Sequence, residues 1–189
     1  VIILIASYCL LFIQKSKAQS YDSLKYRLAQ IKSSADTNHL KEAFAWISRM
    51  TSEDGVKNDL LDAIENLGAV VDEIDYYDLV SSYFNRLIAI NTATTNTKAL
   101  ELGKMWLLKH DRPGTKYGQY TFLGILRDLR MVFRNTGNLS ESIEFYSSWE
   151  KKFLSQNDSA AVSIADNVLS GSYIRLGIFE RGVDYQLKS

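Results

Sequence analysis

Residues 133–153 read FRNTGNLSESIEFYSSWEKKF, and residues 173–189 read YIRLGIFERGVDYQLKS. Both stretches begin with an aromatic residue, place a glycine at the fourth position after it, and place a bulky apolar residue at the second position after the glycine. The two glycines are Gly137 and Gly177. Because glycine readily adopts the left-handed conformation that ends a helix, each stretch predicts a helix that stops at the glycine and a second helix after it.

Apolar spacing around the first glycine predicts a helical hairpin. Across 118–135 and across 139–154, large apolar residues recur at every third or fourth position, which places them on one face of a helix. We expect Gly137 to cap the end of the first helix and Asn138 or Ser140 to cap the start of the second. The two helices then form an antiparallel pair.

The same helical spacing covers the rest of the chain. The other predicted helices are 21–33, 39–51, 98–110, 162–176 and one that begins at Phe179. Residues 155–158 are predicted to form a polar loop with capping residues. The stretch 55–91 is consistent with one long bent helix or with two helices that break near 72–75, and we favour two. No segment alternates apolar and polar residues as a strand would.

Composition fits a folded helical chain and argues against one class of function. The 189 residues include 46% hydrophobic and 23% charged side chains, as ordinary folded domains do. Lys+Arg and Asp+Glu both number 22, so the formal net charge is zero. A protein that binds nucleic acid through its phosphates normally carries a basic surplus or stripe, so we expect no nucleic-acid partner. Pro113 is the only proline, which also favours helix.

The opening segment is predicted to direct export. Residues 1–13 are uncharged and mostly apolar, a length that suits a secretory signal and falls short of the ~20 residues needed to span a bilayer. Residues 16–18 then offer a small–x–small cleavage pattern. We interpret 1–18 as a signal peptide without its start; a buried first helix, or a lipid anchor at the single cysteine, Cys9, are less favoured alternatives. The mature domain is expected to comprise 19–189.

Two patterns resemble a known repeat family. Residues 169–182 read LxxxYxxxGxFxxG and residues 129–142 read LxxxFxxxGxLxxS, and both resemble the tetratricopeptide repeat. The resemblance implies that one small residue of each second helix lies where two helices touch most closely. The matching small residues are Ala43, Ala99, Ser142 and Gly182. Their intervals are uneven, and all are longer than the family period of ~34 residues. A Leu-Gly pair typical of the family at 67–68 and at 102–103 indicates a second, conflicting register over 55–110.

The resemblance implies an all-α fold of stacked antiparallel hairpins that form a right-handed α-solenoid. One hairpin cannot bury its apolar face alone, so copies stack and each covers the next. Such a solenoid is expected to bind a protein or peptide along its concave face and not to be an enzyme. It would leave apolar surface at the last helix, so the natural chain is expected to continue beyond Ser189.

An export signal followed by divergent repeats resembles the extracytoplasmic sensor region of bacterial membrane-bound histidine kinases and related regulators. That resemblance implies a periplasmic location, free or tethered, with membrane contact only through a transmembrane helix further along. The alternative is an exported helical surface protein that binds carbohydrate or another ligand, with aromatic side chains stacking on sugar.

No motif predicts a catalytic, cofactor-binding or metal-binding residue. The turn at 113–118 is too short for a phosphate-binding loop. His39 and His110 lie far apart in the chain and lack cysteine neighbours, so each is expected at a helix end and not in a metal site. His110 and Asp111 could suggest acid–base chemistry with a serine, but the Ser-Gly-Ser at 170–172 lies within a helical pattern and not in a nucleophile turn.

Two further groups have both a functional and a structural interpretation. One is an acidic cluster of Asp72, Glu73, Asp75 and Asp78. It does not follow calcium-loop spacing, so we expect a solvated helix junction. The other is a set of aromatic residues, Tyr26, Trp46, Tyr76, Tyr83, Trp106 and Tyr120. These side chains could line a peptide groove, although packing between helices is favoured for each one.

Overall fold

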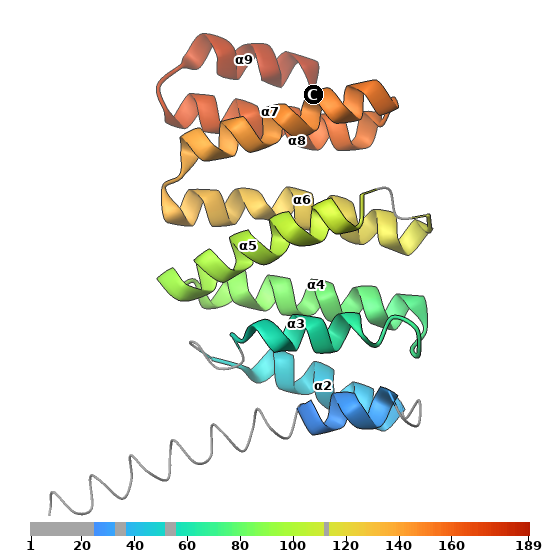
Figure 1. Ribbon diagram of the computed structural model, residues 1–189. Coiled ribbons are helices and arrows are strands. Elements are labelled where there is room, and N and C mark those ends of the chain that lie inside the picture. The colour runs from blue at the N-terminus through green and yellow to red at the C-terminus, as the bar shows by residue number, and fades with distance from the viewer. Residues whose placement is uncertain (1–24, 33–36, 52–55, 112–113) are drawn as a thin grey trace, which may run out of the picture. The chain divides into compact units, whose positions relative to one another are not determined.

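The computed structural model describes residues 25–32, 37–51, 56–111 and 114–189. These residues form helices and no strand, which confirms the all-α prediction (Figure 1). No helix in these ranges combines the length and apolar character that a bilayer crossing requires. The predicted signal peptide at 1–18, with Cys9, lies outside the described residues. The chain divides into two compact units, Val1–Arg86 and Leu87–Ser189.

The first unit contains a helix at 25–32, α2 (Thr37–Arg49), α3 (Asn58–Glu65) and most of α4 (Glu73–Ile90). Its core is mainly aliphatic, with Leu28, Ile31, Ala43, Ile47, Leu60, Ile64, Leu67 and Leu79 all buried, and it also includes the aromatic residues Tyr76, Tyr83 and Phe84. Beyond the end of α2, the carbonyl of Met50 accepts a hydrogen bond from Arg86 Nε at 2.8 Å. This bond ties α4 to the segment that follows α2.

The stretch 55–91 forms two helices, as favoured, but the break lies at 66–72 and not at 72–75. Glu73 and Asp75 lie in the first turn of α4. Carboxylates are stabilised at a helix N-terminus by the unpaired backbone N–H groups and the helix dipole. The acidic cluster therefore starts α4 and does not interrupt a helix. Asp72, Glu73 and Asp78 are exposed, as a solvated junction requires.

The second unit contains α5 (Ala93–Lys109), α6 (Lys116–Thr136), α7 (Leu139–Gln156), α8 (Ser159–Arg175) and α9 (Phe179–Lys188). Figure 1 shows α6 to α9 as successive antiparallel helices joined by short turns. Helix α8 packs against α7 on one side and α9 on the other, and it also contacts α6. Its buried residues include Ala161, Ala165, Leu169 and Tyr173.

Helix α5 begins at Ala93, ahead of the predicted start at 98. Thr92 and Thr95 cap each other: Thr95 N donates to Thr92 Oγ1 at 3.2 Å and Thr92 N donates to Thr95 Oγ1 at 2.9 Å. This reciprocal arrangement satisfies two backbone donors that the first turn leaves open. The helix start was predicted too far along the chain because the apolar spacing begins only at Ala99, after a polar first turn.

The last three turns of the second unit recur at even intervals along the chain. A residue in the left-handed conformation follows each of α6, α7 and α8, and these residues are Gly137, Asn157 and Gly177, with φ of 74°, 57° and 78°, whereas the residue that follows α5, His110, has φ of −106°. In every case the next N–H donates to the carbonyl of the aromatic residue one helical turn before the left-handed one. The bonds join Asn138 to Phe133 at 3.1 Å, Asp158 to Phe153 at 3.0 Å and Ile178 to Tyr173 at 2.9 Å. This is the Schellman arrangement. The two glycine turns seen in the sequence are therefore separated by two helix-and-turn units, with Asn157 midway between them.

The predicted caps are confirmed in part. Gly137 and Gly177 end their helices as expected, and the loop predicted at 155–158 contains only Asn157 and Asp158, since α7 extends to Gln156. Asp158 caps α8, with its carboxylate accepting from Ala161 N at 3.0 Å.

The prediction that Asn138 or Ser140 caps α7 is confirmed for the position of Asn138 but not for a capping bond. Asn138 occupies the N-cap position but forms no side-chain cap bond. Its amide instead donates to Glu141 Oε2 at 3.2 Å, so the side chain is held away from the backbone N–H groups of the first turn.

Replacing Gly137 with alanine is expected to lower the free energy of unfolding by about 1 to 2 kcal/mol, because an L-residue is strained in the left-handed conformation. No atom lies within 4 Å of the added Cβ. The loss of unfolding free energy therefore measures the backbone strain alone. The matched control is Gly124→Ala within α6, which also adds a Cβ into open space and should gain about 0.5 to 1 kcal/mol. Urea unfolding of both variants measures the difference, and equal shifts would contradict it.

Candidate functional site

A hollow of about 280 Å³ lies where α6, α7 and α8 meet. Its lining comprises Arg130, Met131, Phe133, Arg134, Leu139, Ser142, Asn167, Val168, Gly171, Ser172 and Arg175. We call this the arginine groove. None of these lining residues is acidic, although the chain as a whole carries as many acidic as basic side chains. The groove is therefore a local concentration of positive charge.

The three arginines of the groove come from two helices. Arg130 and Arg134 lie one turn apart on α6, and Arg175 ends α8. All three are exposed. Arg130 Nη1 donates to Asn167 Oδ1 at 3.4 Å, a long hydrogen bond to a neutral group. Within the described residues, Arg134 and Arg175 form no side-chain hydrogen bond or ion pair.

The base of the arginine groove is apolar and firmly packed. Phe133 and Val168 are buried, while Met131 and Leu139 are half-buried. At the contact between α7 and α8, the hydroxyls of Ser142 and Ser172 lie 3.2 Å apart. The groove thus has a fixed hydrophobic base beneath charged side chains that water can reach.

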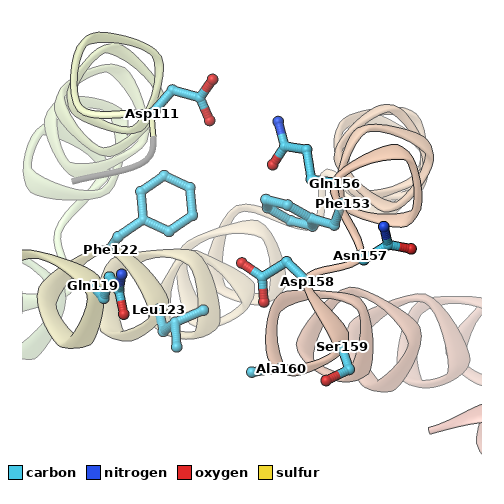
Figure 2. Close-up of a pocket in the computed structure, with 10 residues that line it drawn as sticks. All are labelled: Asp111, Gln119, Phe122, Leu123, Phe153, Gln156, Asn157, Asp158, Ser159 and Ala160. Carbon is cyan, nitrogen blue, oxygen red and sulfur yellow. The ribbon is translucent and has the colours of Figure 1, made fainter. Parts of the chain in front are cut away.

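A second hollow of about 500 Å³ lies beside the turn between α7 and α8 (Figure 2). Its two carboxylates already have partners. Asp111 pairs with Lys152 Nζ at 2.7 Å, and Asp158 caps α8. Phe122 and Phe153 are buried and meet edge to face, with ring centroids 6.1 Å apart and planes at 87°. Neither ring presents a free face, so this hollow lacks the stacking surface that a sugar needs.

The carboxyl groups of Asp166 and Glu150, together with the hydroxyl of Tyr185, connect the last three helices. Asp166 on α8 is only 2% exposed, and its burial, together with the charge of Glu150 on α7 and a hydrogen bond to it, raises the pKa of the Asp166 carboxyl. Tyr185 on α9 donates from its hydroxyl to Glu150 Oε2 at 3.3 Å. Burial and the same carboxylate raise the pKa of Tyr185, whereas Lys188 favours the ionised form of Asp166.

Stability is expected to depend on pH through Asp166. A raised pKa means that the folded chain keeps this proton after the unfolded chain has released it, so the contribution of Asp166 to stability is most favourable in acid and falls as pH rises from about 4. Asp166→Asn removes the charge and keeps a hydrogen-bond donor for Glu150. We expect this variant to be more stable than the parent at pH 7 by about 1 kcal/mol and to lose less stability between acid and neutral pH.

The measurement is urea unfolding of the parent and of Asp166→Asn across that pH range. The matched control is Asp184→Asn, which changes an exposed carboxylate on α9 and should leave the pH dependence intact. A slope unchanged by Asp166→Asn would contradict the expectation.

The histidines and serines that could suggest catalysis lie at helix ends or buried within a helix. His110 is the C-cap residue of α5 and stacks on Trp106, with ring centroids 4.4 Å apart. His39 lies near the start of α2. Ser170 and Ser172 are buried in α8, and Ser170 Oγ donates to the carbonyl of Gly182 at 2.7 Å. Nowhere in the described ranges do three or more His, Cys, Asp or Glu residues form a group that could hold a metal ion.

The aromatic residues considered for a groove divide into two sets. Tyr76, Tyr83 and Trp106 are buried and pack between helices. Burial also raises the pKa of the Tyr83 hydroxyl above its usual range. Tyr26 and Tyr120 are 63% and 61% exposed, and Trp46 is half-buried. None of the six lines the arginine groove.

Sequence reasoning missed the arginine groove itself. The signal that was present is the pair Arg130 and Arg134, since positions i and i+4 lie on one helix face. The third member, Arg175, lies on a later helix, and it joins the pair only because α8 packs back onto α6. Comparison of the chain with known protein families, with characterised proteins and with solved structures finds no match.

Proposed function

We propose that the chain is a non-enzymatic helical-repeat scaffold that binds a protein or peptide. Its architecture is a right-handed α-solenoid of tetratricopeptide-like hairpins. The observation that carries the proposal is the packing of α8, which buries apolar surface on α7 and α9 and meets α6 along the open arginine groove. In stacked hairpins, this contact between the first helices of neighbouring units lines an extended binding surface.

The even recurrence of the turns supports the same proposal. Helices α7 and α8, of 18 and 17 residues, follow one another through the same left-handed turn, and each returns against its predecessor. Regular units of this kind contact mainly their neighbours, so one face of each helix stays available to a partner.

We further propose an exported, periplasmic sensor or interaction region of a bacterial signalling protein, on the strength of the signal-like segment at 1–18 and the repeat pattern. The alternative of a carbohydrate-binding surface protein is favoured by no particular site, because the rings in the larger hollow are covered.

The test is selection of peptides from a random library on the immobilised chain, followed by mapping of the bound peptides through backbone amide chemical shifts. The expected result is a set of binders whose shifts concentrate on the residues of α6 and α8 that line the groove. Exposed positions of α7, such as Ser148 and Leu154, serve as the internal control. Failure to select any binder, or shifts confined to the outer helices, would refute a peptide-binding scaffold on this face.

A further inference from the structure

We propose that the arginine groove binds an acidic peptide segment, whose carboxylate side chains pair with Arg130, Arg134 and Arg175. This inference rests on the proposed scaffold function and names the chemistry of its partner. It follows from the pairing of charges in the second unit, from the shape of the groove and from the geometry of the guanidinium group.

The groove gathers three cations on one surface with no acidic residue among its lining. Elsewhere in the described part of the second unit some cations are paired, Lys104 with Glu141, Lys152 with Asp111 and Arg127 with Asp128, and the unpaired ones do not line a common hollow. At the groove, Arg134 and Arg175 have no carboxylate partner in the described part of the chain, and the side-chain hydrogen bond that Arg130 forms there is to the neutral amide of Asn167. Like charges gathered without counter-charges repel one another. An anionic ligand bound among the three arginines would offset this electrostatic repulsion.

Helix electrostatics explains only part of this arrangement. Arg134 and Arg175 lie in the last turns of α6 and α8, where cations are favoured by the helix dipole. Arg130 lies in the interior of α6, outside that last turn, and gains no such benefit. A binding role accounts for all three residues together.

The groove has room for peptide side chains. Its volume of about 280 Å³ lies just below the ~300 to 1,000 Å³ typical of sites for whole small ligands. On α8, Gly171 exposes its backbone, and a Cβ built there meets no atom within 4 Å. The half-buried Met131 and Leu139 provide an apolar contact surface next to the arginines. A segment that alternates acidic and apolar residues matches both features.

The guanidinium group is well suited to pair with oxyanions such as carboxylates. Arginine presents planar donors that bind a carboxylate through two parallel hydrogen bonds, with more directional specificity than lysine provides. All the cations of the groove are arginines. The same donors also bind phosphate, but three cations in a chain of zero net charge do not form the extended basic surface that a nucleic acid requires. An acidic peptide is therefore the occupant that we assign.

The experiment measures fluorescence anisotropy of labelled peptides with the chain at low and at physiological salt. The probes are a Glu/Leu alternating peptide, its Gln/Leu counterpart, and a version with phosphoserine in place of glutamate. We expect the Glu/Leu peptide to bind at least about tenfold more tightly than the Gln/Leu peptide, because each charge-assisted hydrogen bond contributes on this order. Its affinity should fall as salt is raised.

The variant Arg134→Gln/Arg175→Gln is expected to weaken binding of the Glu/Leu peptide by about tenfold or more. The matched control is Arg127→Gln, which removes an arginine from the same helix that is paired with Asp128 and does not line the groove. It should bind as the parent does. Circular dichroism confirms that each variant is folded.

Three results would overturn the assignment: no difference between the Glu and Gln peptides, equal weakening by Arg127→Gln, or tighter binding of the phosphoserine peptide than of the glutamate peptide. Each of them leaves the scaffold proposal standing, provided that library selection still yields binders on α6 and α8. Failure of that selection would instead remove the scaffold function itself.

Discussion

Replacing Gly182 with valine is expected to loosen α9 from α8 and to lower the free energy of unfolding by about 3 kcal/mol, the upper part of the range for overpacked sites. A Cβ at this position would lie 2.5 Å from Ile174 Cγ1 and 3.2 Å from the carbonyl oxygen of Ser170. The Ser170 carbonyl belongs to the backbone of α8 and cannot turn aside, so even if the partly exposed Ile174 changes rotamer, the valine side chain is expected to push the two helices apart. Separation also breaks the 2.7 Å hydrogen bond from Ser170 Oγ to the Gly182 carbonyl.

Urea unfolding measures the loss for Gly182→Val, and hydrogen exchange of the amides in α9 shows where it acts. The matched control is Gly171→Val on α8, where an added Cβ meets no atom within 4 Å, and it should change stability by no more than about 0.5 kcal/mol. Similar losses in the two variants, or unchanged exchange in α9, would show that close approach at Gly182 does not hold this helix pair together.

The close approach at Gly182 was predictable, and its counterpart at Ser142 only in part. Both positions were expected to be small because two helices touch there, and both are buried. For Ser142, however, the hydroxyl in contact belongs to Ser172 on α8, the first helix of the next hairpin and not of its own. Sequence spacing identified a crowded position but could not identify the neighbour, since that depends on how hairpins pack.

Helix ends were predictable where a glycine marks them and were missed where another type of residue begins or ends the helix. Gly137 and Gly177 were recognised, whereas Asn157 was taken as part of a general polar loop. Asparagine is among the few residues that adopt the left-handed conformation at low cost, so the even period of the turns was readable in principle. The start of α5 after Thr92 and the break before Glu73 were misplaced for a related reason: polar residues that begin a helix resemble polar residues that interrupt one.

The arginine groove could not be predicted because its members are brought together only by tertiary packing. Arg130 and Arg175 lie far apart in the chain, and both are on exposed helix faces, where a charged residue is ordinary. Their significance depends on two structural facts: that α8 contacts α6, and that no carboxylate lines the space between them. Composition gave no hint of it, since the whole chain has zero net charge.

Replacing Phe153 with alanine is expected to cost about 3 to 5 kcal/mol, the range for removing a fully buried aromatic side chain. Phe153 is 1% exposed. Its ring stacks on Trp149 with centroids 5.2 Å apart and meets Phe122 of α6 edge to face. The ring therefore fills the contact between α6 and α7, and its removal leaves a void that rigid helices cannot close.

The measurement for Phe153→Ala is urea unfolding, with near-UV circular dichroism to report the loss of aromatic packing around Trp149. Leu154→Ala is the matched control, because this neighbour is 56% exposed and its truncation should cost less than about 1 kcal/mol. Phe153→Leu, which retains most of the apolar volume, should recover more than half of the loss. A cost for Phe153→Ala no larger than that for Leu154→Ala would mean that the ring of Phe153 does not join α6 to α7. The contact between these helices would then have to be held at the arginine groove, where Phe133 meets Phe145 and Tyr146.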